Sequence, residues 1–263
     1  MSEYSAYSRP QSSNTIGDQQ VIRIENLAKA FGNHQVLIDV SLELFERENL
    51  VILGRSGTGK SVLIKCIVGL ITPDKGRMIV LGQDVADLSA PELDVMRRKI
   101  GFSFQLSALY DSMTVRQNLE FPLRRNMTNL NEGEINDMVE EALENVSLAY
   151  AIDRMPSELS GGMKKRVGIA RTLILNPSIM LYDEPTAGLD PITAGEINEL
   201  ILEVRETYNT ASIIITHDIA CARMTGDRMI LMDSGYLPLM GTYEELAATR
   251  DPRLQPFFDY SSH

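Results

Sequence analysis

The sequence predicts an α/β domain with a parallel sheet at its centre. Three short, continuous apolar runs, residues 50–53, 179–182 and 212–215, are typical of strands that are buried on both faces. Residues 38–44 instead alternate between apolar and polar side chains, which favours a strand with one wet face in an antiparallel pair. No strand pattern occurs between about 106 and 177. We therefore expect an antiparallel opening, a parallel core and a helical insertion.

The composition is that of an ordinary globular domain. The 263 residues are 44% hydrophobic and 23% charged, enough for a sizeable core without disulfides. The formal net charge of −11 disfavours nonspecific binding to nucleic acid or to anionic lipid, so no nucleic-acid partner is expected. Cys66 and Cys221 have no metal-ligand spacing and are interpreted as reduced core thiols.

The N-terminal part divides into a tail and the first strands. Residues 1–20 are polar, lack the apolar segment of a secretory signal and predict a flexible tail. Residues 21–24 predict a short strand, which precedes the alternating strand at 38–44. No apolar run approaches the ~18 residues of a membrane span, and we expect a soluble, intracellular chain.

Helical spacing of apolar residues separates the predicted strands. It occurs in residues 60–70, 162–175 and 191–206. A further amphipathic helix, entered through Asn131 as its N-cap, has apolar side chains at Ile135, Met138, Val139, Ala142, Leu143 and Val146.

Residues 54–61, GRSGTGKS, match the phosphate-binding pattern GxxxxGK[ST]. Glycines let successive backbone N–H groups point at phosphate oxygens, Lys60 adds a positive charge, and the Ser61 hydroxyl suits Mg²⁺. The pattern follows a buried strand and opens a helix, which is the context that the chemistry requires. We therefore expect a nucleotide and Mg²⁺ to bind here; the family resemblance given below implies that the nucleotide is ATP. The candidate ATP-binding residues are Gly54, Arg55, Ser56, Gly57, Thr58, Gly59, Lys60, Ser61 and Val62.

Two carboxylates, Asp183 and Glu184, follow the apolar strand at 179–182. Asp183 is the candidate for holding Mg²⁺, and Glu184 is the candidate general base that polarises the attacking water. The alternative is an acidic pair that caps the turn at Pro185.

Residues 159–163, LSGGM, precede a predicted helix. The Ser160 hydroxyl, the amides of Gly161 and Gly162 and the helix N-terminus together make a second anion-binding end. A simple helix cap is the alternative for a Ser-Gly-Gly sequence.

The order of these motifs resembles the ATP-binding cassette (ABC) family of transport ATPases. The phosphate loop, Gln105, LSGGM, LYDEPTAGLD and His217 follow one another as in that family, over about residues 21–240. The resemblance implies a P-loop NTPase fold with a RecA-like parallel-sheet core, an N-terminal antiparallel β subdomain and a helical subdomain at about 106–177. It implies an ATPase domain at 21–241, followed by a C-terminal extension at 242–263.

The resemblance also implies roles for single residues. Phe31 would stack on adenine, unless it only packs in the core. Gln105 would ligate Mg²⁺ and sense a membrane partner, and Glu184 would be the catalytic carboxylate. His217 would reach the γ-phosphate and hold the water. Asp190 would lie at the contact between two subunits.

In this family, two copies sandwich ATP between the phosphate loop of one and the LSGG element of the other. A homodimer is therefore implied, and the absence of a span implies a separate permease. Residues 106–123 are the expected docking groove for that permease, although their Leu and aromatic side chains could equally form lobe core.

Within the family, the wording of residues 105–124, LSGGM and the C-terminal DPRLQPFFDY resemble the ATPases of bacterial Mla-type phospholipid transporters, which work with MCE-domain proteins. Met163 departs from the Gln of most cassettes, which places any hydrogen bond from that side chain in doubt.

This branch implies a phospholipid substrate and a function in outer-membrane lipid asymmetry. It implies as partners an integral permease (MlaE-like), a small STAS-domain subunit (MlaB-like) and an MCE-domain protein (MlaD-like). The ATPase would lie on the cytoplasmic face of the bacterial inner membrane, held by the permease.

A further prediction concerns the aromatic side chains near the C-terminus. Phe257, Phe258 and Tyr260 are expected to dock on a partner or on the second ATPase, because a free tail rarely exposes such aromatics. The alternatives in function are the ATPase of a polar-solute importer and a non-transport cassette acting on ribosomes or DNA.

Overall fold

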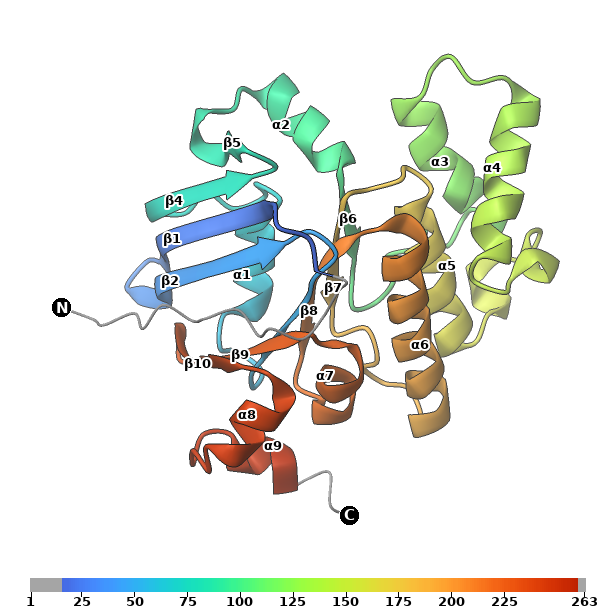
Figure 1. Ribbon diagram of the computed structural model, residues 1–263. Coiled ribbons are helices and arrows are strands. Elements are labelled where there is room, and N and C mark those ends of the chain that lie inside the picture. Colours follow the sequence, from blue (N-terminus) through green and yellow to red (C-terminus); the bar gives the residue numbers. More distant parts are fainter. Residues whose placement is uncertain (1–15, 260–263) are drawn as a thin grey trace.

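The structure is a computed structural model and describes residues 16–259. It contains two β-sheets and a helical lobe (Figure 1). The first sheet is antiparallel, with strand order β2-β1-β4-β5. Its strands are β1 (Gln20–Phe31), β2 (His34–Phe45), β4 (Lys75–Val80) and β5 (Gln83–Asp84). The predicted antiparallel opening is therefore confirmed, and it recruits two further strands.

The second sheet has the order β10-β9-β3-β8-β7-β6. All of its neighbours pair in parallel except β10, which is antiparallel to β9 at one edge. Its strands are β3 (Asn49–Leu53), β6 (Ile100–Ser103), β7 (Ile179–Asp183), β8 (Ala211–Thr216), β9 (Arg228–Asp233) and β10 (Tyr236–Gly241).

The continuous apolar runs have the predicted cause, because the parallel strands supply two cores at once. In β3, Val51 and Leu53 belong to a core shared with the helical lobe, whereas Leu50 and Ile52 belong to a core under the antiparallel sheet. All four side chains are fully buried. A strand whose two faces are both covered favours apolar side chains at successive positions, as in residues 50–53.

The helices surround the parallel sheet and form the lobe. They are α1 (Lys60–Ile67), α2 (Ala90–Arg98), α3 (Val115–Asn126), α4 (Glu132–Glu144), α5 (Gly161–Leu173), α6 (Pro191–Tyr208), α7 (Ile219–Thr225), α8 (Tyr243–Ala248) and α9 (Gln255–Asp259). Residues 106–177 hold α3, α4 and α5 and no strand, as expected (Figure 1). Asn131 caps α4 through a hydrogen bond from the backbone N–H of Glu134, 3.0 Å long. No helix in the described part of the chain is long and apolar enough to cross a membrane.

The end of the predicted N-terminal tail belongs to the folded part of the chain. β1 begins at Gln20, and the backbone N–H of Gly17 already donates to the carbonyl of Glu46. Residues 17–20 are therefore paired with the end of β2, and the rest of the predicted tail, up to residue 15, lies outside the described residues. β1 also runs past residue 24, because the left-handed backbone of Asn26 (φ +52°) interrupts the alternation without ending the strand.

The C-terminal aromatics pack on their own chain, which corrects the prediction that they dock on a partner. Phe257 is 8% exposed and, with Leu254, belongs to the core shared with the helical lobe. The rings of Phe258 and Tyr243 meet edge to face, with centroids 5.6 Å apart. Tyr260 lies outside the described residues. The predicted extension thus completes the domain.

A buried ion pair fixes the antiparallel sheet on the parallel one. Arg228 of β9 donates from Nε to the Glu48 carboxylate at 2.7 Å and from Nη2 to the carbonyl of Glu43 in β2. Burial raises the pKa of Glu48 even though the Arg228 charge opposes it. Removing one partner of such a pair typically costs about 3–5 kcal/mol, so the pair sets how the two sheets meet.

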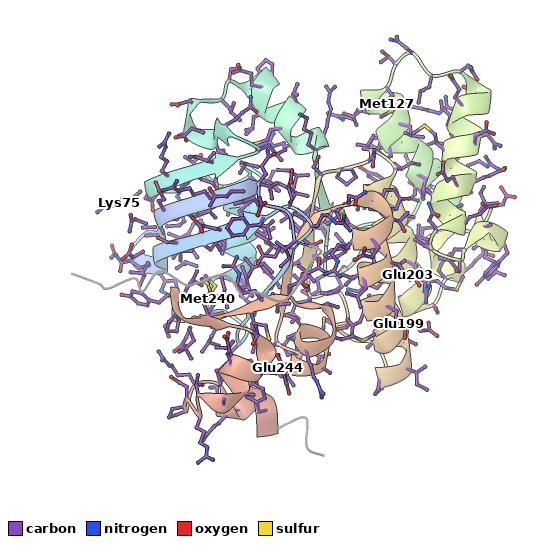
Figure 2. All side chains as sticks on the ribbon, in the orientation of Figure 1. Lys75, Met127, Glu199, Glu203, Met240 and Glu244 are labelled. Carbon is purple, nitrogen blue, oxygen red and sulfur yellow. The ribbon has the colours of Figure 1, made fainter. Side chains whose placement is uncertain are left out.

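The two cysteines are core residues, as predicted, whereas several acidic side chains are exposed. Cys66 and Cys221 are free and buried, and burial raises the pKa of Cys221 to about 12. Acidic side chains cover outer helix surfaces, including Glu199 and Glu203 of α6 and Glu244 of α8 (Figure 2).

Candidate active site

The phosphate loop, residues 54–59, joins the buried strand β3 to helix α1. Gly59 has a left-handed backbone (φ +108°), and a Cβ there would lie 2.7 Å from the carbonyl oxygen of Val36 in β2. Only glycine fits this approach. Gly59 is also the N-cap residue of α1 and provides no side-chain cap. The first N–H groups of α1 therefore remain available to an anion.

Lys60 lies inside this loop. Its side chain is nearly buried, and Nζ donates to the carbonyls of Gly54 (2.5 Å) and Arg55 (3.0 Å). Nζ is also 3.7 Å from Oε1 of Glu184. Burial lowers the pKa of Lys60, and the neighbouring carboxylates oppose that effect. The loop thus holds a positive charge where a phosphate would be bound.

Ser61 and Asp183 supply oxygen ligands next to that charge. The Ser61 hydroxyl donates to Oδ1 of Asp183, which ends β7, at 3.3 Å. Burial raises the pKa of Asp183, and the hydrogen bond from Ser61 lowers it. A hydroxyl and a carboxylate are the donors that Mg²⁺ prefers. The described residues hold no cluster of three His, Cys, Asp or Glu that suits a metal. These oxygens therefore fit a Mg²⁺ that also binds substrate phosphates and water.

Glu184 faces His217 across the end of the sheet. Oε2 of Glu184 lies 2.8 Å from Nδ1 of His217, which follows β8 directly. The backbone of Glu184 is left-handed (φ +50°), and its N–H donates to the carbonyl of Ile215 at 2.9 Å. This conformation is uncommon for a residue with a Cβ, although other described residues such as Asn26 and Asn209 share it. It aims the carboxylate at Lys60 and His217 instead of capping a helix.

Phe31 ends β1 at the hairpin next to the phosphate loop. Its ring is 50% exposed, which excludes the alternative that it only packs in the core. Nζ of Lys29 lies 5.5 Å from the ring centroid. The hairpin touches the loop where Val36 approaches Gly59. An exposed ring beside a phosphate loop suits stacking on a nucleobase.

The LSGG element forms a second group of candidate residues. The Ser160 hydroxyl accepts the backbone N–H of Met163 at 3.3 Å and caps α5. A Cβ on Gly162 would lie 2.5 Å from Cγ2 of Thr193 in α6. Asp190 in turn caps α6, and its carboxylate accepts the Thr193 hydroxyl at 2.6 Å. Ser160 and Asp190 are therefore exposed N-caps of two neighbouring helices, and Gly162 is buried where α5 meets α6. Met163 packs against the core of the lobe, where a thioether suits an apolar contact.

Gln105 follows β6 and is exposed. Its backbone carbonyl accepts a hydrogen bond from Lys165 of α5, whose Nζ also donates to the carbonyl of Glu184. Lys165 is not among the site residues predicted from the sequence. A signal was present, because Lys165 shares the helical spacing of Gly162, Ile169 and Leu173, which are all buried.

A phosphate loop between a buried strand and a helix, with carboxylates at the end of another parallel strand of the same sheet, defines a P-loop NTPase. The model of the ABC transporter family matches residues 37–187, which is more than half of the chain. This chain therefore belongs to the ABC transporter family and carries its ATPase domain.

Relatives of known name cover most of the chain. The probable ribonucleotide transport ATP-binding protein mkl of Mycobacterium leprae is 38% identical over 90% of this chain and 68% of its own length. The chloroplast protein trigalactosyldiacylglycerol 3 of Arabidopsis thaliana is 36% identical over 90% of this chain and 73% of its own length. The solved ATP-binding cassette MJ0796, a dimer bound to ADP and Pi, aligns with a TM-score of 0.77, 33% identity and coverage of 84% of this chain and 98% of its own.

Proposed function

We propose that this chain hydrolyses ATP as one of two identical ATPase subunits of a phospholipid transporter. The observation that carries the ATPase assignment is the group formed by Lys60, Asp183, Glu184 and His217 at the ends of three adjacent elements. Lys60 neutralises phosphate charge, and Ser61, Asp183 and Gln105 hold Mg²⁺, which supplies further charge neutralisation when bound.

Glu184 is the general base in this proposal. It takes the proton of the attacking water, and His217 holds the carboxylate and reaches the γ-phosphate. The contact of 2.8 Å between Oε2 of Glu184 and Nδ1 of His217 fixes the direction of the carboxylate before substrate binds. Such preorganisation avoids reorganisation in the transition state. Phe31 stacks on adenine at the outer side of the loop.

Two copies are needed because one chain provides two incomplete halves. The phosphate loop leaves the outer side of the γ-phosphate open to water, and Ser160, Gly161 and Gly162 present a second helix N-terminus. Closure of the partner's helix end over bound ATP would exclude water and strengthen the electrostatic contacts. Asp190, beside this element, would lie at the contact between the subunits.

The permease is proposed to dock beside Gln105. Leu106 is 88% exposed, and the exposed rings of Tyr110 and Phe121 lie 5.1 Å apart between centroids. Other apolar residues of the predicted groove, Val115, Leu119 and Leu123, are buried in the lobe. The segment thus serves both as lobe core and as an exposed apolar patch. We define this docking patch as Leu106, Tyr110 and Phe121.

Phospholipid is the proposed substrate on two grounds. Residues 105–124, LSGGM and DPRLQPFFDY resemble the Mla branch, and the name of the Arabidopsis relative is that of a diacylglycerol lipid. The proposed partners are an integral permease, a STAS-domain subunit and an MCE-domain protein, with the ATPase at the cytoplasmic face of the bacterial inner membrane. A ribonucleotide or another polar solute is the second candidate, because the mycobacterial relatives are named for ribonucleotide transport.

The test is purification of the tagged chain from membranes, with mass spectrometry of the bound subunits and lipids. Phospholipid together with an MCE-domain protein would support the proposal. A solute-binding protein, or ATP turnover stimulated by ribonucleotides, would support the second candidate instead. Recovery without any membrane subunit would contradict both.

The docking patch has its own test. Tyr110→Ser should lower permease recovery about tenfold while the isolated chain still binds ATP, because an exposed aromatic that is buried on binding dominates interface energetics. Tyr236→Ser is the matched control, since Tyr236 is similarly exposed (47% against 44%) but lies on β10. Equal recovery of both variants would argue against this patch.

A further inference from the structure

One buried lysine joins the helical lobe to both sides of the candidate active site. Lys165 lies on α5 and is 7% exposed. Its Nζ donates to the backbone carbonyl of Gln105 at 2.5 Å and to that of Glu184 at 3.1 Å. Gln105 follows β6 and Glu184 follows β7, so a single ammonium group connects three elements.

The position is costly for a lysine, which makes its contacts informative. Burial lowers the pKa of Lys165, while the negative charges of Asp183 and Glu184 raise it. A buried ammonium group needs hydrogen-bond acceptors, and here both acceptors belong to the backbone of candidate site residues. On the same face of α5, Ile169 and Leu173 are apolar and buried.

We propose that Lys165 is a positioning residue for ATP hydrolysis. It holds the backbones of Gln105 and Glu184 relative to the helix that begins with Ser160. The catalytic geometry is then complete only while α5, and with it the helical lobe, stays packed on the parallel sheet. This inference rests on the proposed roles of Glu184 and Gln105.

The backbone of Glu184 explains why such support is needed. Its left-handed conformation (φ +50°) is one that a residue with a Cβ adopts only when its surroundings impose it. Its carbonyl accepts the backbone N–H of Ala187 at 3.2 Å and the ammonium of Lys165 at 3.1 Å. Without Lys165, one of these two bonds is lost, and the direction of the carboxylate is less well fixed.

A second cation on α5 separates loop anchoring from this function. Arg171 donates to the carbonyls of Ser107 (2.9 Å) and Ala108 (2.8 Å), just after Gln105. Both residues have left-handed backbones (φ +59° and +46°). Arg171 therefore ties the loop to the lobe without a bond to Glu184, whereas Lys165 bonds to the backbone of the proposed base itself.

The experiment compares Lys165→Met with Lys165→Arg and Lys165→Gln in the full chain. Lys165→Met should lower kcat about 10- to 100-fold, as expected for a small displacement of a reacting group, and should change the KM for ATP less than threefold. It should also raise the Mg²⁺ concentration needed for half-maximal rate, because the backbone of Gln105 is released. Lys165→Arg, which keeps the donors, should recover most of kcat, and Lys165→Gln should fall between the two.

Arg166→Met is the matched control. Arg166 neighbours Lys165 in sequence, but it bonds to Glu196 and to the carbonyl of Val146, away from the phosphate loop. It should keep its kcat and Mg²⁺ dependence. Wild-type kcat and Mg²⁺ dependence in both Lys165→Met and Lys165→Gln would overturn the inference. So would losses in Arg166→Met that equal those in Lys165→Met.

A Glu184→Gln arm separates failure of this inference from failure of the proposed function. If Glu184→Gln hydrolyses ATP at the wild-type rate, the assignment of Glu184 fails and the inference fails with it. If Glu184→Gln is inactive while Lys165→Met and Lys165→Gln are normal, only the role of Lys165 is wrong. Melting temperatures of all variants, measured without nucleotide, show whether a loss of folding accounts for a loss of rate.

Discussion

Helices α1 and α5 both have glycines at their N-terminal ends, but they begin in different ways. The N-cap of α1 is Gly59, which offers no side chain, whereas the N-cap of α5 is Ser160, whose hydroxyl accepts the N–H of Met163. Lys60 and the carboxylates of Asp183 and Glu184 surround the start of α1. The start of α5 instead packs against Thr193, beside Asp190.

This difference indicates that the two helix ends have different functions. The start of α1 has a positive charge with a hydroxyl and two carboxylates close to it, which suits the binding of a triphosphate. The start of α5 has a hydroxyl and helix amides, so it can complete an anion site but cannot catalyse on its own. A chain that carries both ends is suited to pairing with a second copy. Substitutions at the two ends should therefore differ in kind.

The largest expected effect is at α1. Lys60→Met should weaken ATP binding about 100-fold or more, because hydrogen bonds to charged groups contribute about 1.5–3 kcal/mol each. Equilibrium binding of a fluorescent ATP analogue to the purified chain would measure this. Affinity within threefold of the wild type would show that the loop binds phosphate without this charge.

The second effect separates binding from chemistry at the same end. Glu184→Gln keeps the size of the side chain but removes the base, and a general base contributes about 10²–10⁴-fold in rate. We expect turnover at least about 100-fold below wild type, together with ATP affinity that is unchanged or tighter. Phosphate release and nucleotide binding, measured on one preparation, would check both parts. Unimpaired phosphate release would mean that another group activates the water.

The smallest effect is at α5 and has an internal control at α4. Ser160→Ala and Asn131→Ala each remove an N-cap that accepts the N–H three residues later, so each should destabilise the fold by about 1 kcal/mol. Only Ser160→Ala should lower turnover, about tenfold, and reduce ATP-dependent dimerisation. Turnover assays and analytical ultracentrifugation with ATP would compare the two. If both variants lose turnover equally, the effect is one of stability alone.

The sequence predicts those features of the molecule that depend on residues close together in the chain, such as buried strands and the phosphate loop. The runs at 50–53 and 179–182 are apolar throughout because each strand supplies two cores, and the glycines of the phosphate loop answer to local backbone geometry. The resemblance to the ABC family also singled out Gln105 and His217. In the structure, Gln105 follows β6 and His217 follows β8.

Features that depend on distant parts of the chain were not predictable in this way. β4 and β10 have mixed patterns because their neighbours decide which positions are buried, whereas residues 229–232 of β9 form a continuous apolar run that was missed. The aromatic side chains of Phe257 and Phe258 show that something must cover them, but not that their own chain does so. The helical spacing of Lys165 indicates that it is buried, but it does not indicate which groups accept its hydrogen bonds. Those acceptors are backbone carbonyls of Gln105 and Glu184, and every residue has such a carbonyl.

The placement of Leu254 and Phe257 has a consequence for synthesis on the ribosome. Domains generally fold as units during translation, from the N-terminus onward. The core shared with the helical lobe includes side chains from β3 through to residue 257. The phosphate loop of a nascent chain is thus synthesised early, but the apolar core that Leu254 and Phe257 cover stays exposed until these residues emerge. During that interval the growing polypeptide would be a natural client for chaperones.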